Sequence, residues 1–231
     1  MIHVTNLQKA YNETTVLNIP ELTISQGESV GLVGNNGAGK TTFFRLMLDL
    51  IQASSGEITI HGEKIARRDD WKSQVGSFLD ESFLIDFLTA EEFFNFIASV
   101  YGLSSEDLSL FYQSMEAFFN GEIIGNKKFI RDLSKGNQKK TGIAAALLSR
   151  PKILILDEPF TALDPSSQIR LKRLLNELQA TTDITMLISS HDLNHVTEVC
   201  KRTVVLDKGC IVKDLKTSAD TLKELESYFA V

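Results

Sequence analysis

Gly34-Asn35-Asn36-Gly37-Ala38-Gly39-Lys40-Thr41 is the segment from which the core of the fold can be predicted. It fits the pattern G-x-x-x-x-G-K-[ST], follows an apolar run over Ser29–Val33 and precedes a helical pattern over Lys40–Leu50. Its glycines allow the backbone to curl, so that several N–H groups can face one phosphate group. The helix that follows directs the positive end of its dipole at the same anion. Strand, glycine-rich loop and helix in this order predict a phosphate-binding α/β core.

The residue types in this loop predict their chemistry. We expect Lys40 to reach the β- and γ-phosphates of a nucleoside triphosphate, and the Thr41 hydroxyl to hold Mg²⁺. A plain glycine-rich turn is the structural alternative, and the flanking strand and helix patterns argue against it. The predicted nucleotide-binding residues of the loop are Gly34, Asn35, Asn36, Gly37, Ala38, Gly39, Lys40, Thr41 and Thr42.

A second acidic site follows the run Ile153–Leu156, which is apolar on both faces, as a strand inside a parallel sheet must be. The next residues are Asp157-Glu158-Pro159, at the carboxyl edge of the sheet, where open α/β proteins bind ligands. We expect Asp157 to orient Mg²⁺ and Glu158 to polarise the attacking water as general base. An acidic turn capping a strand is the alternative, and the phosphate loop makes it the weaker one.

Further strand and helix patterns extend this core outward. Apolar runs at Ile184–Ser190 and Thr203–Leu206 predict two more strands of a mostly parallel sheet. Near the N-terminus, alternating patterns at Val4–Leu7, Val16–Ile24 and Ile58–Ile60 indicate a small antiparallel layer. Further helices are expected over Ala90–Tyr101, Leu108–Asn120, Gly136–Leu148 and Ser166–Gln179.

The whole chain, residues 1–231, is therefore predicted to form one α/β domain with subdomains. The catalytic core with its antiparallel layer would comprise about 1–79 and 151–213. A helical insertion over 80–150, rich in Phe, would separate its halves, and 214–231 would form a short linker and helix.

Composition excludes some classes of protein. The net charge of −6 argues against a dedicated nucleic-acid binder, which usually has a basic field. No apolar run reaches the ~18–20 residues needed to span a bilayer, and the first residues do not resemble a secretory signal. We therefore expect a cytosolic chain. The two cysteines, Cys200 and Cys210, predict no metal or disulfide framework, and we expect both to be small buried hydrophobes.

A third motif narrows this broad class. Leu133-Ser134-Lys135-Gly136-Asn137-Gln138-Lys139-Lys140 resembles the L-S-G-G-Q signature of the ATP-binding cassette family. Lys135 replaces the first glycine and Asn137 the usual glutamine, in a form similar to that of the drug- and lipid-exporter branches. The resemblance implies that the segment begins a helix, and that Ser134 and Gly136 reach the γ-phosphate held by an opposing subunit.

Other segments resemble the same family in order and spacing, from Tyr11 to about Lys213. Thr161–Pro165 is similar to its D-loop, and the resemblance makes His191 the switch histidine that contacts the γ-phosphate and positions Glu158. Tyr11 stands at the adenine-stacking position, although a tyrosine packed on the core is a rival interpretation. Asp80 stands where the family has a glutamine that helps to bind Mg²⁺.

The resemblance also implies a function and partners. Two such chains would pair head to tail around two ATP molecules, and hydrolysis would power transport, with export favoured by Asp80 and Lys135. A separate transmembrane permease would hold the chain on the inner face of the cell membrane, with no nucleic acid involved. The runner-up is a soluble mechanochemical ATPase of the same superfamily, acting on ribosomes, DNA or another protein. A nucleotide-binding regulator without hydrolysis is a third class, which the presence of Lys40, Asp157, Glu158 and His191 disfavours.

Overall fold

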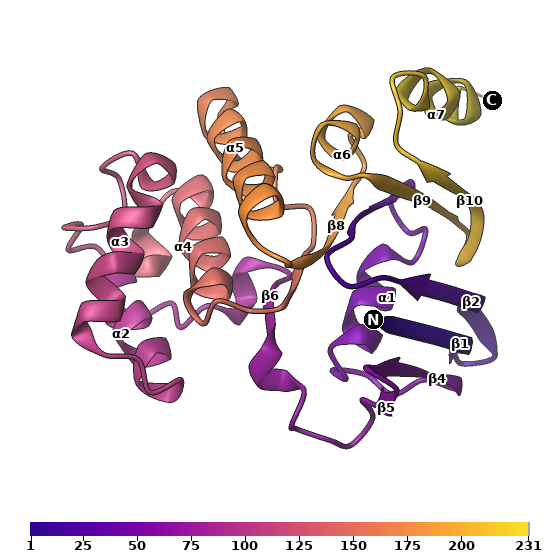
Figure 1. Ribbon diagram of the computed structural model, residues 1–231, viewed down its shortest axis with the longest axis horizontal. Helices are drawn as coiled ribbons and strands as arrows, with labels where there is room; N and C mark the ends of the chain where they lie inside the picture. Colours follow the sequence, from indigo (N-terminus) through magenta and orange to yellow (C-terminus); the bar gives the residue numbers. More distant parts are fainter. Residues whose placement is uncertain (231) are drawn as a thin grey trace.

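A computed structural model describes residues 1–230, and its centre is a sheet of six strands in the order β10-β9-β3-β8-β7-β6 (Figure 1). The inner neighbours all pair in parallel, and only β10 runs antiparallel, against β9. Strands β3, β7 and β8 are buried along their whole length, as the two-sided apolar runs predicted. The six strands span Val75–Phe78 (β6), Ile153–Leu156 (β7), Thr185–Ser190 (β8), Ser29–Val33 (β3), Arg202–Asp207 (β9) and Cys210–Lys216 (β10).

A second, antiparallel sheet has the order β2-β1-β4-β5. Its strands are β1 (Ile2–Tyr11), β2 (Thr14–Ile24), β4 (Ser55–Ile60) and β5 (Glu63–Lys64). Helix α1 (Lys40–Met47) packs between the two sheets, because Phe43 and Phe44 belong to one buried cluster with side chains from both. The helix that follows the phosphate loop is thereby fixed from two sides.

Three helices lie together beyond β6, all inserted between β6 and β7 (Figure 1). They are α2 (Ala90–Val100), α3 (Ser105–Phe119) and α4 (Lys135–Leu148), with short 3₁₀ turns η1 (Lys72–Gln74), η2 (Glu81–Phe83) and η3 (Ile130–Asp132) along this part of the chain. Thr89 and Ser104 start α2 and α3 with capping boxes, which satisfy backbone N–H groups that the helix leaves free. Local sequence therefore fixes where both helices begin.

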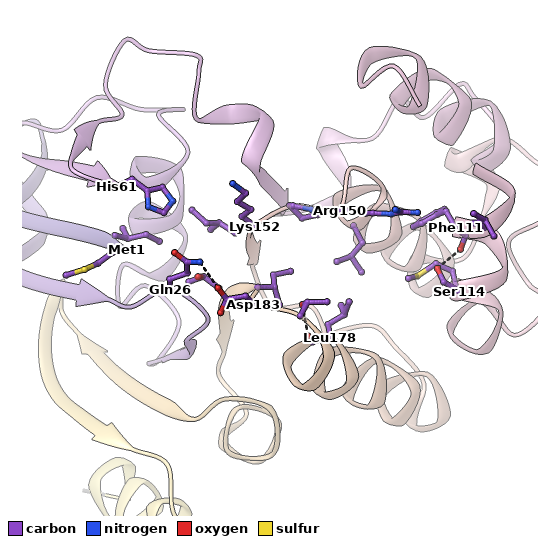
Figure 2. A pocket seen from close by; sticks show the side chains of 18 residues that line it. Met1, Gln26, His61, Phe111, Ser114, Arg150, Lys152, Leu178 and Asp183 are labelled. Atoms are coloured by element: carbon purple, nitrogen blue, oxygen red, sulfur yellow. Dashed lines mark hydrogen bonds between the residues drawn. The ribbon is translucent and has the colours of Figure 1, made fainter. Parts of the chain in front are cut away.

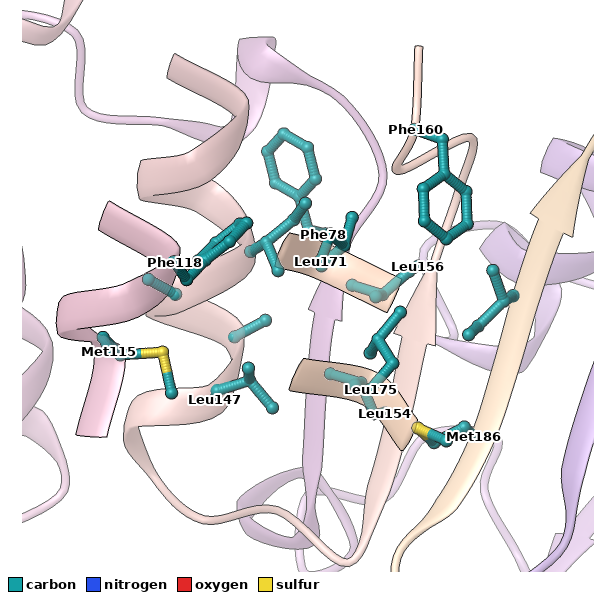
Figure 3. Packing of buried hydrophobic residues seen from close by; sticks show 14 of the residues in the cluster. Phe78, Met115, Phe118, Leu147, Leu154, Leu156, Phe160, Leu171, Leu175 and Met186 are labelled. Carbon is teal, nitrogen blue, oxygen red and sulfur yellow. The ribbon is translucent and has the colours of Figure 1, made fainter. Parts of the chain in front are cut away.

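The remaining helices, α5 (Pro165–Thr181), α6 (Leu193–Val199) and α7 (Thr221–Phe229), follow β7, β8 and β10. Figure 3 shows how α5 joins the sheet to the inserted helices: Leu171 and Leu175 of α5 lie in the same buried cluster as Leu154 of β7 and Phe118 of α3. One continuous core therefore links the sheet and the helical insertion, and the subdomain boundaries near 80 and 150 stay a prediction.

The predicted fold class is confirmed: a mostly parallel core, an N-terminal antiparallel layer and a helical insertion are all present. Strands β5, β6 and β10 and helix α6 were not predicted. The expectation for Cys210 is wrong, because this residue begins the edge strand β10 with its side chain exposed, whereas Cys200 is buried. Among residues 1–230, none of the helices combines the length and the apolar character that a bilayer span requires.

Candidate functional site

The phosphate loop connects the end of β3 to the start of α1, and its three glycines have different tasks. Gly37 and Gly39 have positive φ angles of 83° and 107°, which side chains other than glycine rarely adopt. Gly34 is needed for space instead, since a Cβ atom there would lie 2.2 Å from the Leu206 carbonyl oxygen of β9. The loop thus curls at two glycines and packs against the sheet at the third.

Helix α1 begins without a side-chain cap at Gly39, so no side chain occupies the N–H groups of its first turn. Lys40 is buried at this point, and its ammonium donates a hydrogen bond of 2.6 Å to the Gly34 carbonyl oxygen. The same ammonium lies 3.4 Å from Oε1 of Glu158. A concave anion site with a buried cation and free backbone donors is the result.

The acidic residues after β7 meet the start of α1. The Thr41 hydroxyl donates a hydrogen bond of 2.5 Å to Oδ2 of Asp157, whose other oxygen accepts a hydrogen bond from the Ser189 hydroxyl. Ser189 also accepts a bond of 2.9 Å from the Glu158 backbone N–H. Ser189, at the end of β8, was not predicted as a site residue, and its only sequence signal is its place just before His191.

Glu158 is held in a left-handed backbone conformation, with φ at 48°. Its Oε2 accepts hydrogen bonds from Nδ1 of His191, at 2.8 Å, and from the His191 backbone N–H, at 3.3 Å. Its buried Oε1 has no hydrogen-bond partner among the described residues. One carboxylate oxygen is therefore hydrogen-bonded to His191, and the other faces the Lys40 ammonium without a hydrogen bond among the described residues.

A cavity of 290 Å³ opens above the loop and is lined by Tyr11, Val16, Asn35, Asn36, Gly37, Ala38, Gly39, Lys40, Thr41, Thr42 and Glu158. Tyr11 is 47% exposed, with the Lys9 ammonium 4.7 Å from its ring centroid. The ring is therefore not packed into the core. All the predicted loop residues except Gly34 line this cavity, and Gly34 lies beneath it against β9.

The largest cavity described, of 520 Å³, lies elsewhere (Figure 2). Its lining includes Lys152, Ile153 and Thr185, at the amino ends of β7 and β8, together with side chains of α3 and α5. Asp157 and His191 follow the carboxyl ends of the same strands. Because ligands of open α/β sheets bind at carboxyl ends, the smaller cavity is the candidate active site.

The signature segment forms the start of α4, as the resemblance implied. Ser134 caps the helix by accepting a hydrogen bond of 3.2 Å from the Asn137 backbone N–H. Gln138 donates its side-chain amide to the carbonyl oxygens of Ile130 and Leu133, which fixes the turn before the helix. Ser134 and Gly136 do not line the cavity above the phosphate loop, and Ser134 is exposed. This helix start therefore faces outward.

Asp80, the third predicted metal ligand, caps η2 by accepting hydrogen bonds from the backbone N–H and the hydroxyl of Ser82. Within residues 1–230, no cluster of three or more His, Cys, Asp or Glu side chains is arranged to hold a metal ion. Thr41 and Asp157 fit Mg²⁺ in another way. They supply two adjacent oxygen ligands, and the phosphates of a nucleotide would supply others.

Two protein-family models and a number of known proteins match this chain. The family model described as ABC transporter matches residues 17–161. A second model, described as AAA domain, putative AbiEii toxin, Type IV TA system, matches residues 129–196. The lantibiotic transport ATP-binding protein SrtF of Streptococcus pyogenes is 31% identical over 231 residues, covering 99% of this chain and 96% of that protein.

Other relatives differ in length and in the direction of transport that their names give. The sulfate/thiosulfate import ATP-binding protein CysA of Pectobacterium atrosepticum is 31% identical, over 99% of this chain and 70% of that protein. An uncharacterized ABC transporter ATP-binding protein of Synechocystis sp. is 33% identical over 81% of this chain. This chain spans about half of that protein's length, 53%.

Among solved structures, a dimeric ATP-binding cassette in a post-hydrolysis state, bound to ADP and Pi, is 25% identical, with a TM-score of 0.83. The alignment covers 95% of this chain and all of that one. The similarity therefore includes both sheets and the helical insertion.

Proposed function

We propose that this chain, which belongs to the ABC transporter family, is the ATP-binding and ATP-hydrolysing subunit that powers transport through a separate transmembrane subunit. The observation that carries the proposal is the arrangement of Glu158. Oε2 is bonded to His191, while Oε1 lies beside Lys40 with no hydrogen-bond partner among the described residues. Oε1 of Glu158 is thus the oxygen that would accept a proton, and it lies next to the phosphate-binding loop.

The proposed reaction is hydrolysis of the terminal phosphoanhydride bond of ATP. Lys40 and the loop N–H groups would bind the phosphates, and Thr41 and Asp157 would hold Mg²⁺, which neutralises phosphate charge when bound. Glu158 would accept a proton from water through Oε1 as the water oxygen attacks the γ-phosphorus and ADP leaves. His191 would keep the carboxylate in place. Asp80 stays a possible further metal ligand, and Tyr11 is proposed to stack on the base.

A second copy of this chain, or a close relative, would complete the site. Ser134 and Gly136 start α4 outside the cavity of their own chain, so they are available to the γ-phosphate bound by a facing subunit. The similarity to a dimeric cassette bound to ADP and Pi supports the pairing of two such chains, for which we propose a head-to-tail arrangement. ATP would then favour the closed dimer, because only that state contacts the γ-phosphate from both sides.

The membrane partner would dock beside η2 and α2. Of the six Phe residues between the end of β6 and the end of α2, Phe78, Phe93 and Phe94 are buried, whereas Phe83, Phe87 and Phe96 are 52%, 61% and 50% exposed. Exposed Phe side chains grouped in sequence are typical of a protein contact. They support peripheral attachment to the membrane through a permease, and the similarity to transport subunits favours it over the soluble alternative.

Export is the proposed direction, from the form of the signature at Lys135 and the acidic Asp80. The relatives include chains named for import as well as for transport of lantibiotics, and the proposed direction rests on Lys135 and Asp80. The transported substrate would be chosen by the permease.

The test is a pull-down of the tagged chain from gently solubilised membranes, with mass identification of co-purifying proteins. We expect a stoichiometric multi-span protein, which the Phe87→Asp variant loses while it keeps its ATP hydrolysis. Recovery with ribosomes or nucleic acid instead would favour the soluble mechanochemical ATPase.

A further inference from the structure

Lys139, in the second turn of α4, is a buried cation next to the candidate active site. Its side chain is only 6% exposed, and its ammonium donates hydrogen bonds to the Glu158 carbonyl oxygen, at 3.0 Å, and to the Thr161 hydroxyl, at 2.7 Å. Oε1 of Glu81 lies 3.7 Å away, at ion-pair distance. Two of the three ammonium donors are therefore used in hydrogen bonds, and a carboxylate faces the same charge.

Two of these contacts fall on the turn that carries the proposed general base. The Glu158 carbonyl oxygen also accepts hydrogen bonds from the Thr161 hydroxyl, at 2.8 Å, and from the Thr161 N–H, at 3.3 Å. Both Glu158 and Ala162 have positive φ angles, 48° and 61°, a conformation that is unfavourable for residues with side chains and persists only where surroundings impose it. Lys139 contacts this turn at the Glu158 carbonyl oxygen and at the Thr161 hydroxyl.

The third contact reaches a different element. Glu81 begins η2, directly after Asp80, and the same short turn ends at the exposed Phe83. The Lys139 ammonium also lies 6.0 Å from the ring centroid of Phe78, the last residue of β6. One ammonium group therefore joins α4, the segment after β6 and the turn after β7.

We propose that Lys139 is a positioning residue for hydrolysis: it links η2 to the backbone of Glu158, so that displacement of η2 by a partner changes the orientation of the general base. This inference rests on the proposed role of Glu158. It assigns Lys139 no contact with the nucleotide, since its ammonium meets Glu158 only at the backbone oxygen. Burial lowers the pKa of Lys139, against the opposing charges of Glu81, Glu158 and Asp157.

Lys140 provides a matched control in the next position of the same helix. Its side chain is 1% exposed, and its ammonium pairs at 3.0 Å with Oε2 of Glu122, in the segment after α3. Both lysines are thus buried cations, and the loss of either one removes the positive charge that faces a carboxylate group. Only Lys139 contacts the turn of Glu158.

The experiment measures ATP hydrolysis, ATP binding and Tm of the full chain for Lys139→Met, Lys139→Arg and Lys140→Met. We expect Lys139→Met to lower kcat at least about tenfold, because small misplacement of a catalytic group has effects of this size, and to leave KM for ATP within about twofold. Lys139→Arg should recover part of kcat, since it restores the donors. Lys140→Met should lower Tm yet keep kcat within about twofold of the parent per folded molecule.

Equal kcat values for Lys139→Met and Lys140→Met at comparable Tm would overturn the inference, as would a parallel loss of kcat and ATP affinity. If Lys139→Met does not fold, Thr161→Val gives the same test, because it removes the hydroxyl that Lys139 and the Glu158 carbonyl share while keeping the side-chain shape. The parent chain and Glu158→Gln are measured alongside. Failure of the parent to hydrolyse ATP would contradict the proposed function itself, whereas an active parent with an unaffected Lys139→Met contradicts only this inference.

Discussion

Helices α1 and α4 begin in opposite ways, although each presents a helix start as a proposed anion site. Helix α1 begins at a left-handed glycine with no side-chain cap, and the buried Lys40 stands within its own cavity. Helix α4 begins at Ser134, whose side chain caps the helix, and which is exposed outside that cavity. The first start lines the cavity above the phosphate loop, and the second lies outside that cavity.

The start of α4 lies outside the nucleotide cavity of its own chain, so its proposed ligand is a phosphate that another chain binds. A capped and exposed helix start can still offer a hydroxyl and backbone donors to an anion that another molecule brings. Helix α5 gives a third case for reference, since its cap Asp164 holds only the neighbouring Ser166 and Ser167. Changes at the three helix starts should therefore affect hydrolysis in descending order.

The largest effect is expected at Glu158, the proposed general base, which lies beside the start of α1. Glu158→Gln should lower turnover by about 10²–10⁴-fold, because the amide cannot accept the proton from water, while ATP still binds. The variant should accumulate as an ATP-bound dimer by size-exclusion chromatography. The exposed Glu177→Gln on α5 is the control, and parental turnover in Glu158→Gln would remove the assigned base.

Lysines at the two helix starts offer the next comparison. Lys40→Ala should reduce kcat/KM for ATP by about 10²-fold or more, because a buried cation is lost beside developing phosphate charge. Lys135→Ala should change it less than about threefold, since this side chain is exposed and bonds only to Gln138. If kcat/KM for ATP, measured from steady-state hydrolysis, falls by a similar factor in both variants, the two helix starts do not differ in the way proposed.

Ser134→Ala tests the outward helix start itself. Loss of the cap should cost about 1 kcal/mol of the free energy of unfolding, read from denaturant titration. Loss of the hydroxyl donor should lower kcat by about tenfold, with monomer affinity for ATP unchanged. A weakened affinity of the isolated chain for ATP would instead place Ser134 in the site of its own chain.

The smallest effect is expected at α5. Hydrogen bonds from Ser166 and Ser167 hold the pKa of Asp164 well below its usual range. A lowered folded pKa gives stability that is complete above the pKa of an unfolded aspartate, about 4, and is lost as pH falls through the folded value. Asp164→Asn should therefore reduce the acid dependence of Tm, with little change in hydrolysis at neutral pH. An unchanged acid dependence would argue against the cap.

Most of the fold could be predicted from periodicity, for reasons visible in particular elements. The buried strands Ile153–Leu156 and Ser29–Val33 are apolar on both faces, which few other structures allow. Strand β10 was missed because its alternation places polar and apolar side chains on a half-exposed edge, where it resembles a linker. The same edge position exposes Cys210, so residue type alone gave the wrong burial.

The site was predictable only where a motif marks it. Lys40, Thr41, Asp157, Glu158 and His191 are distant in sequence, and the structure brings them into contact, although their catalytic roles stay predictions. Ser189 and Lys139 were not predicted as site residues. Lys139 stands within the signature segment, but its hydrogen bond to the Glu158 carbonyl oxygen, like those of Ser189 with Asp157 and the Glu158 N–H, joins elements that are distant in sequence. Contacts of this kind depend on how strands and helices pack in three dimensions, which a short sequence pattern does not specify.

In the proposed dimer, one chain binds the phosphates and its partner contributes Ser134 and Gly136. A mixture of two inactive variants tests this arrangement. Lys40→Ala disables the phosphate loop, and Ser134→Glu places a negative charge where the γ-phosphate of the facing chain would lie.

In a mixed dimer, one site would combine both defects and the other would have neither. Hydrolysis in an equimolar mixture should therefore rise to about a quarter of the parental turnover, because about half of the dimers are mixed and each has one intact site. A mixture as inactive as its two components would contradict the account, since it would mean that both helix starts serve the nucleotide of their own chain.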